Sequence, residues 1–260
     1  MITNSNIDGV TAAPRRKKVP AWAQWMYNAF NYMAFDVGGG PRTLRLDHAI
    51  NVQKFVTVFF IFGLMNYYDN FSLGAWVFLG LHGTYGYTWV VKDLAFPNKS
   101  FEQRVTIGSL VAIYCGLNLA YWSLPWLFIS RHVEPSGPLI FTAVAMHTLG
   151  VAWMVAADVQ KNCMMKYRKG LITNGVFAYT RNPNYLGEIM IYVPYALLAS
   201  HWFGWLVIAV QFFCFFLPRM LVKDASISRH PGWEEYARRS GLLIPWRILT
   251  LQALRDKRCD

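Results

Sequence analysis

The sequence has few features of a soluble enzyme. Charged residues make up only 15% of its 260 residues. It contains no Walker loop, HExxH motif, EF-hand loop or Gly-x-Ser-x-Gly elbow, and Gly38-Gly39-Gly40-Pro41 lacks the GxGxxG spacing of a dinucleotide-binding turn. The four cysteines are scattered without a CxxC pair, so they support neither a disulfide framework nor a zinc site, and we expect no bound metal. The water-soluble cofactor folds are therefore excluded as far as a sequence can exclude them.

Long apolar runs take the place of those motifs. Hydrophobic residues make up 55% of the chain, and Ser72 to Val91, Val105 to Ser130 and Pro138 to Ala157 contain no Lys, Arg, Asp or Glu. Runs of about 18 or more apolar residues are typical of transmembrane helices. The pattern predicts an all-α, polytopic membrane protein with six transmembrane helices, or seven if the segment after Pro125 forms its own helix. The six expected spans are Val52 to Tyr68, Ser72 to Val91, one that starts near Val105, Pro138 to Ala157, Tyr185 to Ser200, and His201 to Leu221.

The distribution of basic residues predicts the orientation. The net charge is +11, and most Lys and Arg residues lie in the two terminal segments and in the loops 92–104 and 158–184. With six spans these segments share one side of the membrane, and the positive-inside rule places that side, with both termini, in the cytoplasm. The same distribution argues against a nucleic-acid partner. Lys54, which lies inside the first span, is expected to snorkel to the interface.

The chain divides into five segments by composition. Residues 1–20 form a basic arm that is expected to be disordered, and 21–48 hold an interfacial helix over Ala21 to Phe35 followed by a Gly-rich linker. Residues 49–135 form an N-terminal transmembrane half, 136–250 a C-terminal domain, and 251–260 a tail. The last forty residues are too few and too basic for an independent domain, so we expect them to fold against the cytoplasmic ends of the last spans.

One stretch combines helix-start signals with polar groups at membrane depth. Arg181-Asn182-Pro183-Asn184-Tyr185 predicts a helix start in which Asn182 caps the helix and Pro183 occupies its first position. Asn184 and Glu188 are spaced i, i+4 and share a helix face. A carboxylate inside a membrane-length segment is costly unless it is paired or bonded, so we interpret Glu188 as functional.

Other polar residues lie near the same predicted membrane face. Asp158 ends the fourth span and Lys223-Asp224 follow the sixth, so three span ends converge there. Arg and Lys suit phosphates, while Asp, Asn and Glu accept hydrogen bonds from hydroxyl and amide groups; ordinary flanking charge and helix caps are the alternative interpretation. His82 and Tyr85, spaced i, i+3, share a face of the second span. A buried phenol there either polarises a carbonyl or packs in the core, and His147 is expected to make an interhelical hydrogen bond.

A compound motif points to a family. GLITNGVFAYTRNPNYLGE, two apolar segments, and LVKDASISRHPGWEEYARRSGLLIPWRI resemble the C-terminal domain of steroid 5-alpha-reductases and sterol reductases, closest to the branch called DUF1295. The resemblance covers roughly residues 140–250. It implies an NADPH-dependent membrane reductase that acts on an activated carbon–carbon double bond of an apolar, sterol-like lipid. It also implies that the cofactor lies among the C-terminal spans and opens to the cytoplasm.

The resemblance and the polar residues at that face together give the candidate site. The candidate cofactor-binding residues are Asp158, Lys161, Arg168, Arg181, Asn184, Tyr185, Glu188, Lys223, Asp224, His230 and Tyr236. In steroid 5-alpha-reductases a Glu and a Tyr of the N-terminal half hold the substrate carbonyl, but this chain has Gly83 at the tyrosine position and no matching Glu. Asp69, Tyr85 or His82 would have to substitute, so the candidate catalytic residues are Glu188, Tyr85 and His82.

Two alternatives remain open. Isoprenylcysteine carboxyl and phospholipid methyltransferases, which bind S-adenosylmethionine, resemble the same region through an RHPxYxG motif, in which this chain has Asn182 in place of the His. Glu188 directly after the glycine favours the reductase. The second alternative is a non-catalytic subunit of a membrane complex. The expected location is the endoplasmic reticulum, with a mitochondrial membrane as the alternative, and membrane lipids are the expected partners.

Overall fold

The computed structural model describes residues 17–249. Residues 1–16 of the predicted basic arm and the predicted tail 251–260 lie outside the described residues. Residues 17–20 of the arm are described, and Lys17 binds Asp224 in α8 (Leu217–Ile227) and Ser228 directly after it, so this part of the arm is anchored to the body of the protein.

The described part of the chain is mostly helical. Its helices are α1 (Ala21–Phe35), α2 (Leu46–Tyr67), α3 (Leu73–Ala95), α4 (Ile107–Ser130), α5 (Gly137–Tyr167), α6 (Pro183–Ala199), α7 (Trp202–Val210), α8, α9 (Trp233–Arg239) and α10 (Trp246–Leu249). A 3₁₀ turn at Gly175–Ala178 precedes α6, and a π-helical segment at Gln211–Phe216 joins α7 to α8. Two short antiparallel strands, β1 (Arg42–Arg45) and β2 (Arg104–Thr106), form a ribbon.

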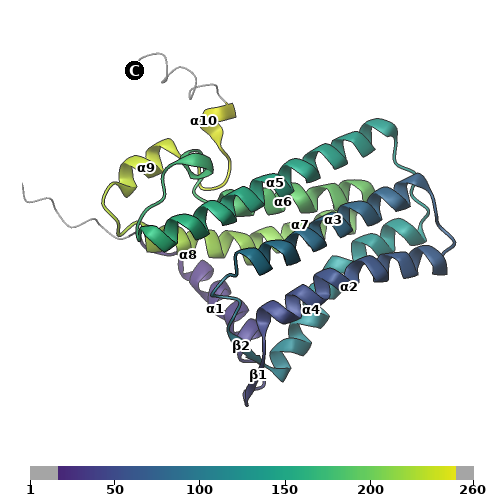
Figure 1. The fold of residues 1–260 in the computed structure, drawn as a ribbon, viewed down its shortest axis with the longest axis horizontal. Helices are drawn as coiled ribbons and strands as arrows, with labels where there is room; N and C mark the ends of the chain where they lie inside the picture. Colours follow the sequence, from purple (N-terminus) through teal and green to yellow (C-terminus); the bar gives the residue numbers. More distant parts are fainter. Residues whose placement is uncertain (1–16, 250–260) are drawn as a thin grey trace, which may run out of the picture.

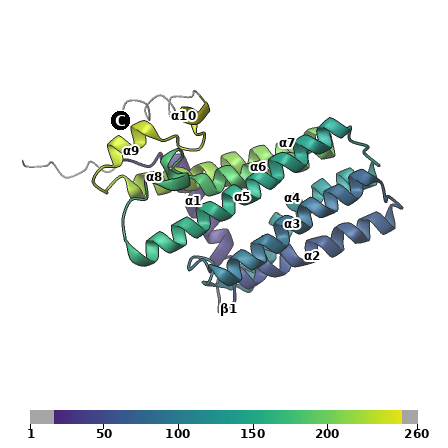
Figure 2. The ribbon, with the colours of Figure 1, turned by 45° about the horizontal axis from the view of Figure 1, so that its top comes forward.

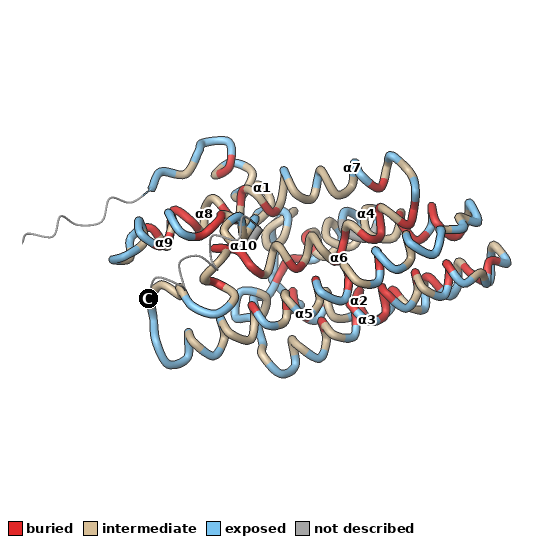
Figure 3. The backbone as a smooth tube through the Cα atoms, turned by 90° about the horizontal axis from the view of Figure 1, so that it is seen from above, coloured by how far each residue is buried: buried red, intermediate tan, exposed pale blue. Residues whose placement is uncertain are grey.

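The long helices lie side by side in a bundle (Figure 1). The short elements α1, β1, β2, α8, α9 and α10 gather at one end of this bundle, in both Figure 1 and the turned view of Figure 2. Buried residues concentrate along inward-facing stretches of the helices, and exposed residues predominate on their outer faces and in the connections (Figure 3). The bundle therefore has one interior, shared by both halves of the chain.

Four helical segments are long and apolar enough to cross a membrane. They are α2, α4, α5 and the continuous run Trp202–Ile227. This confirms the prediction of an all-α membrane protein with transmembrane helices, while the count of six spans and the cytoplasmic termini stay predictions. Helix α3 has 23 residues and α6 has 17, and both pack within the bundle beside these four segments.

Several boundaries differ from the sequence expectations. Helix α4 continues through Pro125 to Ser130, so the segment after Pro125 is not a separate helix. Helix α5 extends to Tyr167, because no helix breaker follows Ala157 until after that residue, so the first part of the expected loop is helical. The first span begins at Leu46 rather than Val52. By contrast, α1 covers Ala21–Phe35 as predicted.

Local side-chain caps explain where several helices begin. The Ser72 hydroxyl accepts a hydrogen bond from the Ala75 amide at the start of α3, and the Thr106 hydroxyl accepts one from the Ser109 amide at the start of α4. Helix α6 begins at Pro183, as predicted, because proline at the first position forfeits only an amide that has no helical partner. Asn182 occupies the N-cap position as predicted, but its side chain makes no capping bond: its Oδ1 has no partner, and its amide donates to the Leu242 carbonyl at 2.9 Å.

Glycines set the closest helix contact in the bundle. A Cβ added to Gly187 of α6 would lie 2.6 Å from the Met154 backbone nitrogen and 2.7 Å from the Gly150 carbonyl oxygen of α5. In the same way, a Cβ added to Gly150 would lie 2.8 Å from the Gly187 carbonyl oxygen. Small residues let two helix backbones approach closely. This contact fixes α6 against α5 at the residue that precedes Glu188.

Candidate functional site

One face of α6 carries the polar residues of the bundle interior. Asn184, Glu188, Tyr192 and Tyr195 follow one another at spacings of four, four and three residues, so they form a stripe along this helix. Tyr192 and Tyr195 are buried, and Asn184 and Glu188 are half-buried. Within residues 17–249 no side-chain hydrogen bond or ion pair engages Asn184 or Glu188. Two polar groups near the helix start thus remain available to a ligand.

The charges around Glu188 favour an anionic ligand. Its charged neighbours are Asp158, Lys92, Lys54 and Arg219. Lys92 of α3 forms an ion pair with Asp158 of α5 at 2.6 Å. Counted formally, the three basic side chains and the two carboxylates of this cluster give a net charge of +1. Lys92 and Arg219 were not among the predicted site residues.

Lys54 occupies the bundle interior, and the prediction that it snorkels is wrong. It is 7% exposed, and its Nζ lies 4.4 Å from the ring centroid of Tyr85 and 4.2 Å from that of Tyr121. A desolvated cation–π contact stabilises an ammonium by about 2 kcal/mol, and two such rings replace part of its lost hydration. The rings come from α3 and α4, so the α2 sequence by itself did not predict this position.

A close helix contact holds Lys54 in place. A Cβ added to Gly86 of α3 would lie 2.7 Å from the Lys54 carbonyl oxygen, so only glycine lets α2 approach α3 so closely here. No side-chain hydrogen bond or ion pair involving Lys54 occurs in the described part of the chain. Its ammonium therefore contacts aromatic rings but has no protein hydrogen-bond acceptor among the described residues.

The predicted catalytic residues Tyr85 and His82 border Lys54 and the α6 stripe. The hydroxyl groups of Tyr85 and Tyr192 lie 2.8 Å apart and share a hydrogen bond. The ring of His82 stacks on that of Tyr195 with centroids 3.7 Å apart, and its Nδ1 lies 3.1 Å from the Phe78 carbonyl oxygen. The buried Nε2 of His82 has no partner. The structure thus brings both residues to the same interior as Glu188.

His147 extends this interior along α5. Its Nε2 lies 3.1 Å from the Tyr195 hydroxyl oxygen, which confirms the predicted interhelical hydrogen bond. The Tyr195 hydroxyl also donates to the Leu81 carbonyl of α3, at 3.4 Å. Helices α3, α5 and α6 are therefore linked through one tyrosine. This link holds the Tyr195 ring on which His82 stacks.

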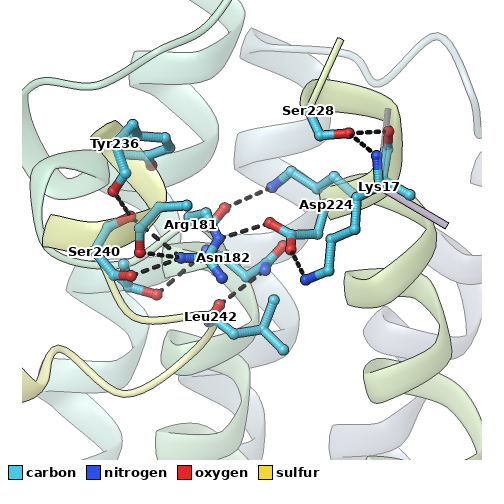
Figure 4. A network of polar contacts seen from close by, with 12 residues as sticks. Lys17, Arg181, Asn182, Asp224, Ser228, Tyr236, Ser240 and Leu242 are labelled. Atoms are coloured by element: carbon cyan, nitrogen blue, oxygen red, sulfur yellow. Dashed lines mark hydrogen bonds and ion pairs between the residues drawn. The ribbon is translucent and has the colours of Figure 1, made fainter. Parts of the chain in front are cut away.

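A second set of predicted residues forms a buried network instead (Figure 4). Arg181 Nε donates to Asp224 Oδ1 at 2.6 Å, and its guanidinium also donates to the Ser240 carbonyl at 2.6 Å. Lys17 Nζ contacts the other carboxylate oxygen of Asp224 at 2.8 Å, and Lys223 Nζ donates to the Arg181 carbonyl at 3.0 Å. These bonds join the start of α6, α8 and the segment after α9. Arg181 and Asp224 thus have protein partners.

Tyr236 of α9 belongs to this network as well. Its hydroxyl donates to the Phe177 carbonyl at 2.8 Å, and its ring is buried. Burial raises the pKa of Tyr236 to about 12 because the phenolate would lose its hydration. The Ser240 hydroxyl donates to the Tyr236 carbonyl at 2.6 Å, and the Gly241 amide donates to the Tyr179 carbonyl. The expected docking of the C-terminal segment against the ends of the last spans is therefore confirmed.

The remaining predicted residues are more dispersed. Lys161 is exposed on α5, and it lies within electrostatic range of Lys223 together with Asp158. Tyr185 packs its ring on Phe216, with centroids 5.0 Å apart. Arg168 is exposed beyond the end of α5 and His230 is half-buried in the turn before α9; neither has a side-chain bond within residues 17–249. In the part of the chain that the structure describes, no group of three His, Cys, Asp or Glu side chains could hold a metal ion.

The arrangement places two proton donors side by side in an aromatic interior. Lys54 supplies an ammonium and Tyr85 a hydroxyl, groups that can donate a proton or a hydrogen bond. The residues that the sequence analysis missed are Lys54, Lys92, Arg219, Tyr192 and Tyr195. The signal for Tyr192 and Tyr195 was present, because they continue the helical spacing that begins at Asn184 and Glu188.

Comparison with known proteins assigns the chain to a family. The family described as "Protein of unknown function (DUF1295)" matches residues 98–239, more than half of the chain. The chain belongs to this family. "Uncharacterized protein C7D4.09c" of Schizosaccharomyces pombe is 32% identical over 69 residues, which are 26% of this chain and 25% of the yeast protein. The chain thus aligns with about a quarter of that relative. No solved structure matches the chain.

The DUF1295 match covers only part of the candidate site. It runs from the loop before β2 to the end of α9, so it contains Asp158, Glu188 and the Arg181–Asp224 ion pair. Lys54, His82 and Tyr85 precede it. The residues that complete the interior next to Glu188 therefore come from the part of the chain outside the DUF1295 match. This chain is a membrane protein of the steroid-reductase-like kind whose site draws on both of its halves.

Proposed function

We propose that this protein is an NADPH-dependent membrane reductase that acts on an activated carbon–carbon double bond of a lipid or sterol-like substrate. The observation that carries the proposal is the unbonded Glu188, which shares a helix face with Asn184 and borders Lys54 and Tyr85. These residues come from α2, α3 and α6. A structural role alone gives no reason for an unpaired carboxylate and an unpaired ammonium in the same apolar interior.

The donors supplied by this chain fit the reduction of a conjugated carbonyl compound. Reduced nicotinamide, when bound, supplies the hydride that adds to the β-carbon of the double bond. The negative charge that develops on the carbonyl oxygen needs a donor, and the Lys54 ammonium and the Tyr85 hydroxyl are the candidates. A proton from Lys54 to the α-carbon of the resulting enolate would complete the saturated product and leave Lys54 as a neutral amine. The aromatic rings around Lys54 keep water out, which strengthens the electrostatic contribution of the ammonium.

The residues at the end of the bundle fit the cofactor. Asn184 and Glu188 offer hydrogen-bonding groups for a carboxamide, and neither has a partner in the described residues. The net positive charge around Glu188 suits a polyanion, and Lys161 and Arg168 lie exposed at the same end. Arg181 and Asp224, which bind each other, would contribute by holding the start of α6 against α8 rather than by contacting the cofactor. An endoplasmic reticulum location belongs to the same proposal and rests on the family resemblance.

Ligand titration of the purified protein tests the proposal. The fluorescence of the eleven tryptophans is followed while NADPH or S-adenosylmethionine is added to the full chain in detergent. We expect saturable binding of NADPH and none of S-adenosylmethionine. We also expect Glu188→Gln to weaken NADPH binding at least about tenfold, the scale of one charged hydrogen bond.

The matched control is Glu134→Gln, because Glu134 is an exposed carboxylate outside the bundle interior. This variant should bind NADPH as the wild type does. Saturable binding of S-adenosylmethionine instead of NADPH would support the methyltransferase. If neither molecule binds to folded protein, the non-catalytic subunit is the better account. Equal NADPH affinity in Glu188→Gln and the wild type would remove Glu188 from the site.

A further inference from the structure

A cavity of about 470 Å³ is lined by α1 and by Arg219 of α8. Its wall combines residues of α1 with the loop before β2, the start of α2 and Arg219 of α8. The polar side chains in this wall are those of Tyr27, Asn28, Asn31, Tyr32, Ser100 and Gln103. The cavity is thus lined with neutral hydrogen-bonding groups. No predicted site residue belongs to it.

Arg219 is the cation of this cavity, and it is poorly satisfied. Its guanidinium lies 4.5 Å from the ring centroid of Phe215 and makes one long hydrogen bond, from Nη2 to Asn31 Oδ1 at 3.4 Å. Its Nε is buried without a partner. An arginine presents five N–H donors, and a buried donor without an acceptor is costly. The guanidinium therefore lacks acceptors that a bound anion would provide.

The other charges in the cavity wall favour an anion. Asp36 and Arg42 also line the cavity, and they neutralise each other in an ion pair of 2.5 Å. Arg219 is thus the one excess charge among the residues that line it. Phosphate is the anion whose geometry matches a guanidinium surrounded by hydroxyl and amide donors.

Helix α1 suggests where such a phosphate would come from. It exposes Trp22, Trp25, Tyr32 and Met33, and aromatic residues of this kind prefer the membrane–water interface. Tyr32 both lines the cavity and reaches the surface. We propose that this cavity binds a phosphate ester through Arg219, carried either by a membrane phospholipid or by a soluble nucleotide. Arg219 also counts among the cations near Glu188, but phosphate binding in this cavity can be measured whether or not the protein is a reductase.

Native mass spectrometry of the full chain in detergent tests the proposal. The probes are phosphatidic acid, diacylglycerol with the same acyl chains, and NADP⁺. We expect phosphatidic acid to bind at least about tenfold more tightly than diacylglycerol, because only the former carries the phosphate. If NADP⁺ displaces phosphatidic acid, the nucleotide is the source of the phosphate; if it does not, the lipid is.

Two variants and one control locate the site. Arg219→Gln should lose at least about tenfold in affinity for the phosphate-bearing probe, whereas Arg229→Gln, which changes an exposed arginine, should not. Asn31→Leu keeps the guanidinium but fills the cavity wall, and it should also weaken binding, so the test survives if Arg219→Gln fails to fold. Equal affinity for phosphatidic acid in the wild type and in a folded variant would overturn the proposal, as would equal binding of the two lipids.

Discussion

The buried pair of Arg181 and Asp224 allows a quantitative prediction. Substitution of Arg181 by Met removes the ion pair with Asp224 at 2.6 Å and the bond to the Ser240 carbonyl at 2.6 Å. Loss of one partner of a buried pair costs about 3–5 kcal/mol because the other charge remains buried. Lys17 still contacts Asp224 at 2.8 Å, so we expect the lower end, about 3 kcal/mol.

Thermal unfolding in detergent measures this effect. For a chain of this size a loss of 1 kcal/mol lowers Tm by about 2–4 °C, so Arg181→Met should lower Tm by roughly 6–12 °C. Arg238→Met is the matched control, because Arg238 is exposed on α9, and its Tm should stay within about 2 °C of the wild type.

A double substitution tests the physical reason for the loss. If the cost arises from an uncompensated carboxylate, Asp224→Leu added to Arg181→Met should restore part of the lost stability. An Arg181→Met protein as stable as the wild type would refute the reasoning. It would also reopen Arg181 as a residue whose role is to contact a ligand.

Three further predictions concern packing, the buried ammonium and the buried phenol. Gly187→Ala should destabilise the protein by about 1–3 kcal/mol, measured by thermal unfolding, because its Cβ would clash with α5, whereas Gly80→Ala, with nothing within 4 Å, should not. Lys54→Met should leave Tm equal or higher, because it removes a buried charge, yet it should abolish product formation measured with NADPH and a conjugated carbonyl substrate. Tyr236→Phe should cost about 1–3 kcal/mol by leaving the Phe177 carbonyl unbonded. Because the folded-state pKa of Tyr236 is raised to about 12, its stabilising contribution is complete below about pH 10 and is lost as pH rises from 10 to 12; the variant should lack that component of alkaline unfolding.

Local signals in the sequence predicted a substantial part of the fold. The bounds of α1 and the start of α6 follow from residues adjacent to them in the chain, such as Pro183. The long apolar runs predicted the membrane helices for the same reason. The extension of α5 to Tyr167 was missed because charged residues in its last turns read as a loop, although they are compatible with a helix that emerges from the membrane.

Partners that lie far apart in the chain could not be predicted. Lys54 is stabilised by rings on α3 and α4, and Arg181 by a carboxylate 43 residues away, so neither environment is visible in a local window. The sequence did predict that Asp158, Glu188 and Lys223 converge on one end of the bundle. It did not distinguish Glu188, which remains unbonded, from Asp224, which is bound on both sides.

The contact of Lys17 with Asp224 has a consequence for biosynthesis. The two residues are 207 positions apart, so the ribosome adds Asp224 about 10–40 s after Lys17 at typical elongation rates. The contact therefore forms only after the last membrane segment has been synthesised. The contact can therefore exist only in a chain that has been synthesised at least as far as α8. A chain that is truncated before α8 would leave Lys17 without this partner, which gives quality-control factors a chemical difference between finished and unfinished molecules.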